Sequence, residues 1–304
     1  MRKPFAEAIL KYLAPERCVF LTGDLGFMAL EGVREAMQSR FINAGVAEQN
    51  MTLVATGMAM EGHIVFTYSI GNFPTLRCLE MIRNDAAYHD ANVKIVSVGG
   101  GFSYGPLGIS HHATEDIAIM RALPGVISVV PTSLWEVAEG TKAVTSASGT
   151  CFLRLDKDHG PDGSPVPPFL LGQPRVLREG MDVAFVVTGG ILSEVVKASE
   201  ELDRLGVRAS IYSVHTIKPF LPALIVEAAR THKAMVTVEE HTIHGGLGGM
   251  VLEALASANS PTGKFLRIGL DGCFSSVVGS QSYLRRAYGM DAGSIVRRTR
   301  ELLA

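Results

Sequence analysis

Short apolar segments alternate with longer helical ones over the first 155 residues. The short runs predict buried strands at 18–21, 41–43, 64–66, 94–98, 126–130 and 151–153. The longer segments predict helices at 48–61, 76–89, 115–122 and 133–144, the last with Ser133 as its N-cap. Strands separated by helices require crossover connections, so the pattern predicts a mainly parallel sheet with helices on both faces.

A proline-rich segment interrupts this alternation. Residues 160–168 read Gly-Pro-Asp-Gly-Ser-Pro-Val-Pro-Pro, and proline lacks a backbone donor and disfavours helix. We therefore expect a linker over 159–175 between a first domain, 1–158, and a second, 176–304. One long surface loop within a single domain is the alternative.

The alternation of strands and helices resumes after the linker. The pattern predicts strands at 183–187, 209–214, 234–238 and 265–268, and helices at 193–205, 223–230 and up to about 256. Ser280 and Asp291 are placed to cap two terminal helices. The sequence as a whole therefore predicts two α/β domains.

Composition excludes several classes of protein. The 304 residues include 28 Lys and Arg and 30 Asp and Glu, a formal charge of −2, so nucleic acid and anionic membrane are not expected partners. Hydrophobic residues make up 47%, which excludes a disordered chain. No apolar run approaches the roughly 18 residues of a membrane-spanning helix, and Glu7 interrupts any signal peptide. The four cysteines form no CxxC pair, so we expect a cytoplasmic protein.

The segment 41–51, Phe-Ile-Asn-Ala-Gly-Val-Ala-Glu-Gln-Asn-Met, is the most informative in the chain. It predicts a strand, a glycine turn and an acid, Glu48, at the start of an apolar helix. This acid could simply complement the helix dipole. Alternatively, a carboxylate in such apolar surroundings could share a proton with a heteroaromatic nitrogen.

A second candidate lies in the segment 105–116, Gly-Pro-Leu-Gly-Ile-Ser-His-His-Ala-Thr-Glu-Asp. The adjacent His111 and His112 could be zinc ligands, but no third ligand stands at suitable spacing, so we predict no metal site in this chain. They could also be ordinary loop residues. A histidine here could donate or accept a proton near neutral pH.

Together these segments resemble the transketolase family. The run 41–51 is similar to the "GIAEQ" signature in the pyrimidine-binding domain of transketolases and deoxyxylulose-phosphate synthases. Phe-Thr-Tyr-Ser-Ile-Gly-Asn-Phe-Pro-Thr-Leu-Arg, 66–77, resembles the family's "YSTF…R" stretch, and 105–116 resembles "GxDGPTHQxxxD". The second half, with "DVAFVVTGG" and "VTVEEHTIHGGLGG", is similar to the family's C-terminal domain.

The resemblance implies a binding site for the cofactor thiamine diphosphate. Glu48 would hydrogen-bond the aminopyrimidine ring and so promote loss of the thiazolium proton, with the cofactor as electron sink. Tyr68, Phe73 and Arg77 fall in the stretch whose aromatic residues hold that ring. Ordinary core packing is the alternative for Tyr68 and for Phe73.

The resemblance also implies contacts with a sugar or sugar-phosphate substrate. His111 would act on substrate oxygens, with His112 assisting, and Arg154 would bind a phosphate. A salt-bridged strand end is the alternative for Arg154. Leu107 stands where the family has an aspartate, and Gly99-Gly100 where it has a histidine, so the standard pentose-phosphate substrates are in doubt.

The resemblance covers two of the three transketolase domains. The missing domain binds diphosphate and magnesium through a "GDG…N" motif, which the segment 22–26, Thr-Gly-Asp-Leu-Gly, imitates imperfectly. We interpret Asp24 as a structural residue or a domain contact. The prediction is the C-terminal subunit of a two-component enzyme that transfers a two-carbon ketol unit. A separate N-terminal-section subunit would hold Mg²⁺. The complete enzyme would be a heterotetramer with a homodimer of this chain at its core.

Two other functions stay open. The β subunits of 2-oxoacid and acetoin dehydrogenases share this domain order and the glutamate, and a non-catalytic interaction protein could keep the fold. In the second half, we expect His241 and His244 to be surface or interface residues first and substrate contacts second. The glycine run at 245–249 is weak evidence for a dinucleotide site, because no acidic strand end follows at the right distance.

Overall fold

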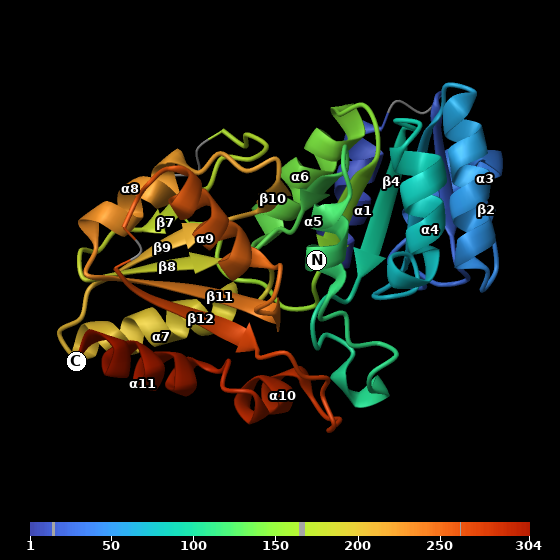
Figure 1. Cartoon of the computed structure of the whole chain (residues 1–304). Coiled ribbons are helices and arrows are strands. Elements are labelled where there is room, and N and C mark those ends of the chain that lie inside the picture. Colours follow the sequence, from blue (N-terminus) through green and yellow to red (C-terminus); the bar gives the residue numbers. More distant parts are fainter. Residues whose placement is uncertain (14–15, 164–167, 262) are drawn as a thin grey trace.

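The computed structural model describes residues 1–13, 16–163, 168–261 and 263–304. Two sheets lie side by side, each with helices packed on its faces (Figure 1). The first has seven strands in the order β10-β5-β6-β4-β3-β1-β2, and the second has five in the order β12-β11-β8-β9-β7. The prediction of two mainly parallel α/β units is confirmed.

The first sheet pairs its strands in parallel, except at β10. Its members are β1 (Cys18–Thr22), β2 (Phe41–Asn43), β3 (Ile64–Ile70), β4 (Val93–Val98), β5 (Ile127–Val129), β6 (Cys151–Leu155) and β10 (Thr216–Lys218). Its main helices are α1 (Arg2–Tyr12), α2 (Glu31–Met37), α3 (Glu48–Met60), α5 (Asp116–Ala122) and α6 (Leu134–Ser146). Helices α1 and α2 are absent from the sequence prediction.

Alternating side chains divide the core of this sheet into two layers. Along β3, Val65 packs with Met51 of α3 on one face, whereas Phe66 packs with Phe5 of α1 on the other. The period of two along a strand places neighbouring residues on opposite faces. This division decides which predicted residues can meet Glu48.

The predicted helix at 76–89 is interrupted. The chain forms a 3₁₀ turn at Leu76–Cys78, one α-helical turn, α4 (Leu79–Met81), and a π-helix at Ile82–Ala87. Its buried residues Cys78, Ile82 and Ala86 recur every four positions. A spacing of four exceeds the 3.6 residues of an α-helical turn, so a wider turn keeps these three on one face.

The second sheet contains β7 (Arg175–Arg178), β8 (Val183–Val187), β9 (Ala209–Ser213), β11 (Ala234–Thr242) and β12 (Lys264–Leu270), with β7 antiparallel to β9. Its helices are α7 (Leu192–Arg204), α8 (Ala223–Thr231), α9 (Leu247–Ser257), α10 (Gln281–Ala287) and α11 (Ala292–Leu303). Ser280 accepts a bond from the Tyr283 N–H and caps α10, whereas Asp291 makes no side-chain cap at α11. Within the described ranges, no helix is long and apolar enough to cross a membrane.

The two halves are joined by more than the predicted linker. Strand β10 comes from the second half but pairs antiparallel with β5 of the first sheet. Residues 164–167 of the predicted 159–175 linker lie outside the described residues, and β7 begins at Arg175. The proposed boundaries at 158 and 176 therefore stay predictions.

A buried carboxylate on α6 lies at this junction. Glu136 is fully buried, and its Oε1 accepts bonds from Arg175 Nη1 (2.7 Å) and Ser213 Oγ (2.8 Å). Its Oε2 accepts from the Thr132 N–H (2.8 Å). One side chain therefore connects α6 with β7 and β9 of the second sheet.

We predict that Glu136→Ala lowers the free energy of unfolding by about 3–5 kcal/mol, because it leaves the buried Arg175 without its carboxylate. Urea denaturation at pH 7 measures this. The control is Glu139→Ala on the same helix, whose ion pair with the exposed Lys142 should contribute less than about 1 kcal/mol. Equal losses in the two variants would contradict the prediction.

Candidate active site

Glu48 lies where the strands of the first sheet end, at the first residue of α3. Its side chain is 2% exposed. Oε1 accepts a hydrogen bond from Ser69 Oγ (2.9 Å), and Oε2 accepts one from Arg77 Nη1 (2.9 Å). The carboxylate therefore lies at the helix start, where it complements the helix dipole, and two specific donors orient it.

A row of side chains leads from Glu48 to His111. The Arg77 guanidinium lies 4.6 Å from the centre of the Phe73 ring. The Phe73 ring meets the edge of His111 at 5.1 Å between centroids, and Tyr104 lies 6.3 Å from His111 on another side. The structure thus brings together four predicted site residues, Glu48, Phe73, Arg77 and His111, from separate segments.

Tyr68 is not in this group. It is fully buried on the opposite face of the sheet, stacked on Phe5 at 5.9 Å and near Phe20 at 5.9 Å. Its neighbour Ser69 points to Glu48 instead, because adjacent residues of a strand face opposite ways. The core-packing alternative therefore describes Tyr68, and the interpretation of this residue as a wall of the cofactor site is corrected.

His111 is half-buried and is the accessible histidine of the pair. Its Nδ1 lies 3.0 Å from Ser110 Oγ. Burial lowers the pKa of His111 from its usual value, and the neighbouring His112 lowers the pKa further. The ring is therefore neutral at pH 7 and can donate or accept a hydrogen bond.

The His112 side chain is enclosed by the protein and has a structural role. It is 1% exposed, its Nε2 lies 3.0 Å from the Gly105 carbonyl oxygen, and its ring packs edge-on against Phe102 at 5.0 Å. Because a carbonyl only accepts, Nε2 must be the protonated nitrogen. Its backbone carbonyl accepts from Asn72 Nδ2 (2.8 Å). The expectation that His112 assists at the substrate is corrected, since its ring is enclosed by the protein.

The Arg154 guanidinium is also buried, and it is paired with other groups of the protein. It is 1% exposed, and its Nε lies 3.4 Å from Asp116 Oδ2 and 3.3 Å from Asp156 Oδ1. Its Nη2 donates to the carbonyls of Ala113 (3.3 Å) and Glu240 (3.2 Å). The salt-bridged alternative describes Arg154, and the expectation of a phosphate contact is corrected, because two carboxylates already neutralise it.

Close packing leaves no space for a side chain at Gly99 or Gly100. Gly99 has a φ of +91°, and a Cβ there would lie 2.1 Å from the Tyr104 ring. A Cβ at Gly100 would lie 1.7 Å from Arg154 Nε. The side chains of Tyr104 and Arg154 thus fill the space that a family histidine would need. Leu107, in place of the family aspartate, is 56% exposed.

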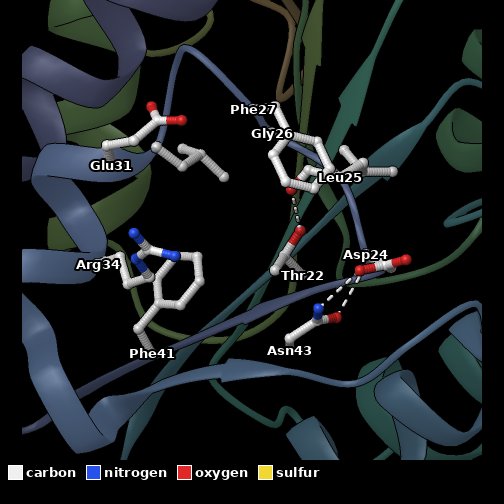
Figure 2. A pocket seen from close by; sticks show the side chains of 10 residues that line it. Thr22, Asp24, Leu25, Gly26, Phe27, Glu31, Arg34, Phe41 and Asn43 are labelled. Carbon is white, nitrogen blue, oxygen red and sulfur yellow. Dashed lines mark hydrogen bonds between the residues drawn. The ribbon is translucent and has the colours of Figure 1, made fainter.

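Asp24 connects the ends of β1 and β2, as Figure 2 shows. Its Oδ1 accepts from Asn43 Nδ2 (2.8 Å), and its N–H donates to Asn43 Oδ1 (3.0 Å). The two residues line a cavity of about 210 Å³ together with Arg34 and Phe27. Adjoining Asp24, Gly23 packs against Glu48, with a hypothetical Cβ 3.4 Å from Oε1. The arrangement gives Asp24 a structural role at the edge of the site.

His241 and His244 differ in their exposure to solvent. His244 is exposed, with Nε2 3.9 Å from Asp271. His241 is fully buried, so of the expected surface or interface position the surface one was wrong for it; its Nε2 accepts from the Ala118 N–H of the first half (3.3 Å). Burial alone would lower the pKa of His241, but the hydrogen bond and charge of Glu239, with Asp116, raise it overall.

Sequence reasoning missed two residues of this site, Ser69 and Tyr104. Ser69 follows Tyr68 in the strand, so strict alternation predicts that one of the pair faces Glu48, although it cannot say which. Tyr104 lies in a loop of irregular structure and carries no local signal. Among the described residues, no group of three or more His, Cys, Asp or Glu is placed to hold a metal ion.

The chain matches two family models. Residues 1–161 match the transketolase pyrimidine-binding domain, and residues 172–295 match the transketolase C-terminal domain. The chain therefore belongs to the transketolase family. It corresponds to the C-terminal section of a split transketolase, a subunit of a transferase.

Relatives with assigned names agree with this. The chain is 34% identical to the 6-deoxy-6-sulfo-D-fructose transketolase subunit SqwH of Clostridium sp., covering 99% of this chain and 94% of the relative. It is 32% identical to an apulose-4-phosphate transketolase subunit of Actinobacillus succinogenes, covering 84% and 83%. A solved structure of a split gene transketolase, an inactive β4 tetramer, matches with a TM-score of 0.86 at 32% identity, covering 99% of this chain and 97% of the other.

The family depends on thiamine diphosphate, and the residues at the sheet edge fit the pyrimidine end of that cofactor. Each Glu48 oxygen takes one protein donor, and a carboxylate oxygen can accept a second. Phe73 offers a partly exposed aromatic ring beside it. The pyrimidine end of the cofactor would therefore find a hydrogen-bond acceptor and an aromatic ring in this chain.

We predict that His111 titrates below the usual histidine value of about 6.5, because its burial and the nearby His112 disfavour the charged ring. NMR titration of the ring proton measures the midpoint. In His112→Gln, which keeps a donor for Gly105 but cannot become charged, the midpoint should rise. His89→Gln, at an exposed position, serves as control and should not change it. A midpoint at or above 6.5 in the native chain would refute the prediction.

Proposed function

We propose that this chain is the pyrimidine-site subunit of a split transketolase that transfers a two-carbon ketol unit between sugars. The observation that carries the proposal is the row of contacts from the buried Glu48 carboxylate to Arg77, from Arg77 to Phe73, and from Phe73 to His111. When bound, thiamine diphosphate supplies the electron sink for breaking and forming the carbon–carbon bond. The residues of this chain supply position and proton control.

Each of these residues has a definite part in the proposal. Glu48 accepts a hydrogen bond from the pyrimidine ring nitrogen and holds its proton there. Arg77 orients the carboxylate through its hydrogen bond to Oε2, and Phe73 would pack beside the ring. Because the His111 ring is neutral at pH 7, it can donate to a substrate oxygen or accept from a substrate hydroxyl.

A cavity beside Tyr104 is the site that we propose for the sugar. It measures about 400 Å³, and Tyr104, Asp156 and Lys157 contribute to its wall. Arg2 and Lys3 lie at the same cavity, so it combines cationic groups with one acid. An anionic sugar would be held there rather than at Arg154. The names of the relatives, which include a sulfonated and a phosphorylated sugar, support this substrate class.

We also propose that an N-terminal-section subunit holds the diphosphate and Mg²⁺ and completes a heterotetramer around a dimer of this chain. Two observations support this: the chain matches the pyrimidine and C-terminal domains, and several relatives are named as subunits. The solved relative is an inactive tetramer of β chains. The cytoplasm is the location we propose.

The first prediction concerns this partner. The purified chain with thiamine diphosphate and Mg²⁺ should show no turnover of ketose donors, and adding a chain that carries the "GDG…N" motif should restore it, because the diphosphate end of the cofactor then has its ligands. Ketose formation is measured by chromatography. Strong activity of the chain alone would refute a split enzyme, and lipoamide reduction instead of ketose formation would identify a 2-oxoacid dehydrogenase subunit.

The second prediction concerns Glu48. In the assembled enzyme, Glu48→Gln should lower kcat by roughly 100-fold or more, because an amide cannot hold the proton. Gel filtration should show the same assembly as the native chain. The control is Glu61→Gln at the other end of α3, where the side chain is exposed and kcat should be unchanged. A nearly native rate in Glu48→Gln would remove the proton role.

A further inference from the structure

The loop that carries His111 is closed at its base and anchored in the second domain. Gly101 and Ala113 form an antiparallel bridge, so residues 102–112 leave the first sheet as one loop. Phe102 is fully buried and packs within the hydrophobic core of the second domain, stacked on Tyr288 at 5.7 Å. The Thr114 carbonyl accepts from the Thr242 N–H (2.8 Å) of β11. The second domain therefore holds both ends of the loop.

Glu240 of β11 makes the direct polar contact with this base. Its Oε1 accepts the Phe102 N–H at 2.5 Å. A Cβ at Gly101 would lie 2.5 Å from the same oxygen, so the carboxylate lies directly on the loop backbone, where the glycine has a φ of +59°. The Glu240 backbone carbonyl accepts from Arg154, which also holds the Ala113 carbonyl.

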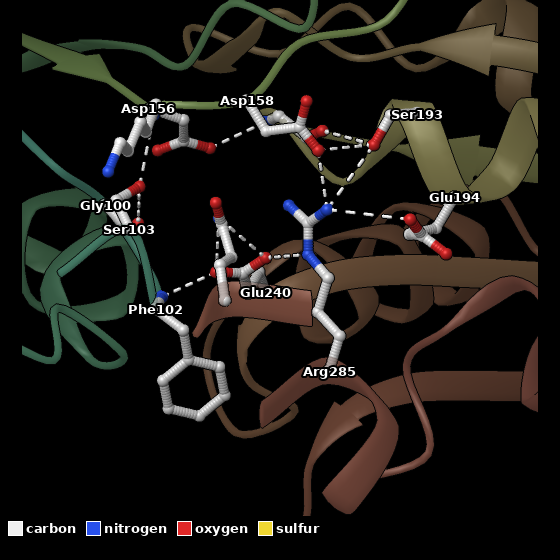
Figure 3. A network of polar contacts seen from close by, with 12 residues as sticks. Gly100, Phe102, Ser103, Asp156, Asp158, Ser193, Glu194, Glu240 and Arg285 are labelled. Carbon is white, nitrogen blue, oxygen red and sulfur yellow. Dashed lines mark hydrogen bonds and ion pairs between the residues drawn. The ribbon is translucent and has the colours of Figure 1, made fainter. Parts of the chain in front are cut away.

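Glu240 also bonds to side chains of its own domain, and Figure 3 shows its contact with Arg285. Gln281 Nε2 donates to its Oε1 (2.9 Å), and Arg285 Nε donates to its Oε2. Arg285 also donates through Nη1 to Asp158 (2.6 Å), at the end of the first domain. Glu240 and Arg285 are both 3% exposed, so these bonds act where water does not weaken them.

From these contacts we propose that Glu240 is a positioning residue for the reaction: it fixes the loop that places His111 beside Phe73 and the substrate. The proposal rests on the proposed function. Apart from Ser110 in its own loop, His111 contacts only aromatic rings among the interactions described above. Its place therefore depends on the path of the loop, and small displacements of a catalytic group reduce rates strongly.

Glu240→Ala tests this in the enzyme assembled from both subunits. We expect kcat to fall by roughly 10- to 100-fold, with little change in the KM for thiamine diphosphate, because Glu48 is untouched. Glu240→Gln should recover part of kcat, because its side-chain oxygen still accepts from Phe102, although its amide nitrogen cannot accept from Arg285 as Oε2 does. The matched control is Glu239→Gln, the adjacent buried carboxylate, which accepts from the Leu247 and Gly248 N–H groups of its own domain and should keep kcat.

A double-mutant cycle with His111→Ala separates positioning from general stability. If Glu240 acts through His111, Glu240→Ala should have little further effect in the His111→Ala enzyme. Independent, multiplying effects would overturn the proposal. So would an unchanged kcat in Glu240→Ala, or an equal loss in Glu239→Gln.

Hydrogen exchange of the complete chain gives a readout that does not need turnover. Amides of residues 101–113 should lose protection in Glu240→Ala and keep it in Glu239→Gln. Unchanged protection would overturn the proposal. If the native two-subunit enzyme transferred no ketol unit, the proposed function would fail, whereas an active native enzyme with an active Glu240→Ala variant would refute only the positioning role.

Discussion

The site depends on a buried carboxylate with two donors, Glu48 between Arg77 and Ser69. An uncompensated buried charge is costly, and the helix start, the guanidinium and the hydroxyl together offset that cost. Parallel strands bring their carboxyl ends to one edge, so α3, the segment after β3 and the loop after β4 converge there. The polarity of the sheet thus assembles a site from segments that are far apart in the chain.

A second constraint is the buried charge between the two halves. Glu240, Arg285 and Arg154 are nearly inaccessible, and each bonds to the other half. The Glu240 carboxylate accepts from the Phe102 N–H, Arg285 pairs with Asp158, and Arg154 donates to the Glu240 carbonyl. Removing one partner from such a network leaves a buried charge unpaired, so the halves are expected to keep one relative position. The loop with His111 passes through this junction, so the second domain contacts the loop on which the proposed function depends.

The same junction accounts for Arg154 and for the glycines at 99 and 100. Arg154 faces Asp116 and Asp156, which already neutralise it, and the glycine pair makes room for Tyr104 and Arg154. These features belong together, because a Cβ at Gly100 would collide with the Arg154 side chain. We therefore propose the cavity beside Tyr104 as the place where the substrate is recognised.

The sequence by itself determined the alternation of strands and helices and the family, because these depend on local periodicity and contiguous motifs. The same motifs predicted the roles that we propose for Glu48 and His111. Only the tertiary structure decided that Tyr68 faces away from Glu48. Alternation along the strand places Tyr68 and Ser69 on opposite faces of the sheet, but it does not say which helix covers which face. Arg154 pairs with Asp116, 38 positions away, and β10 joins the other sheet. Such long-range pairings leave no local pattern in the sequence. The burial of His112 and His241 also depends on segments far away in the chain, so the sequence could not predict it.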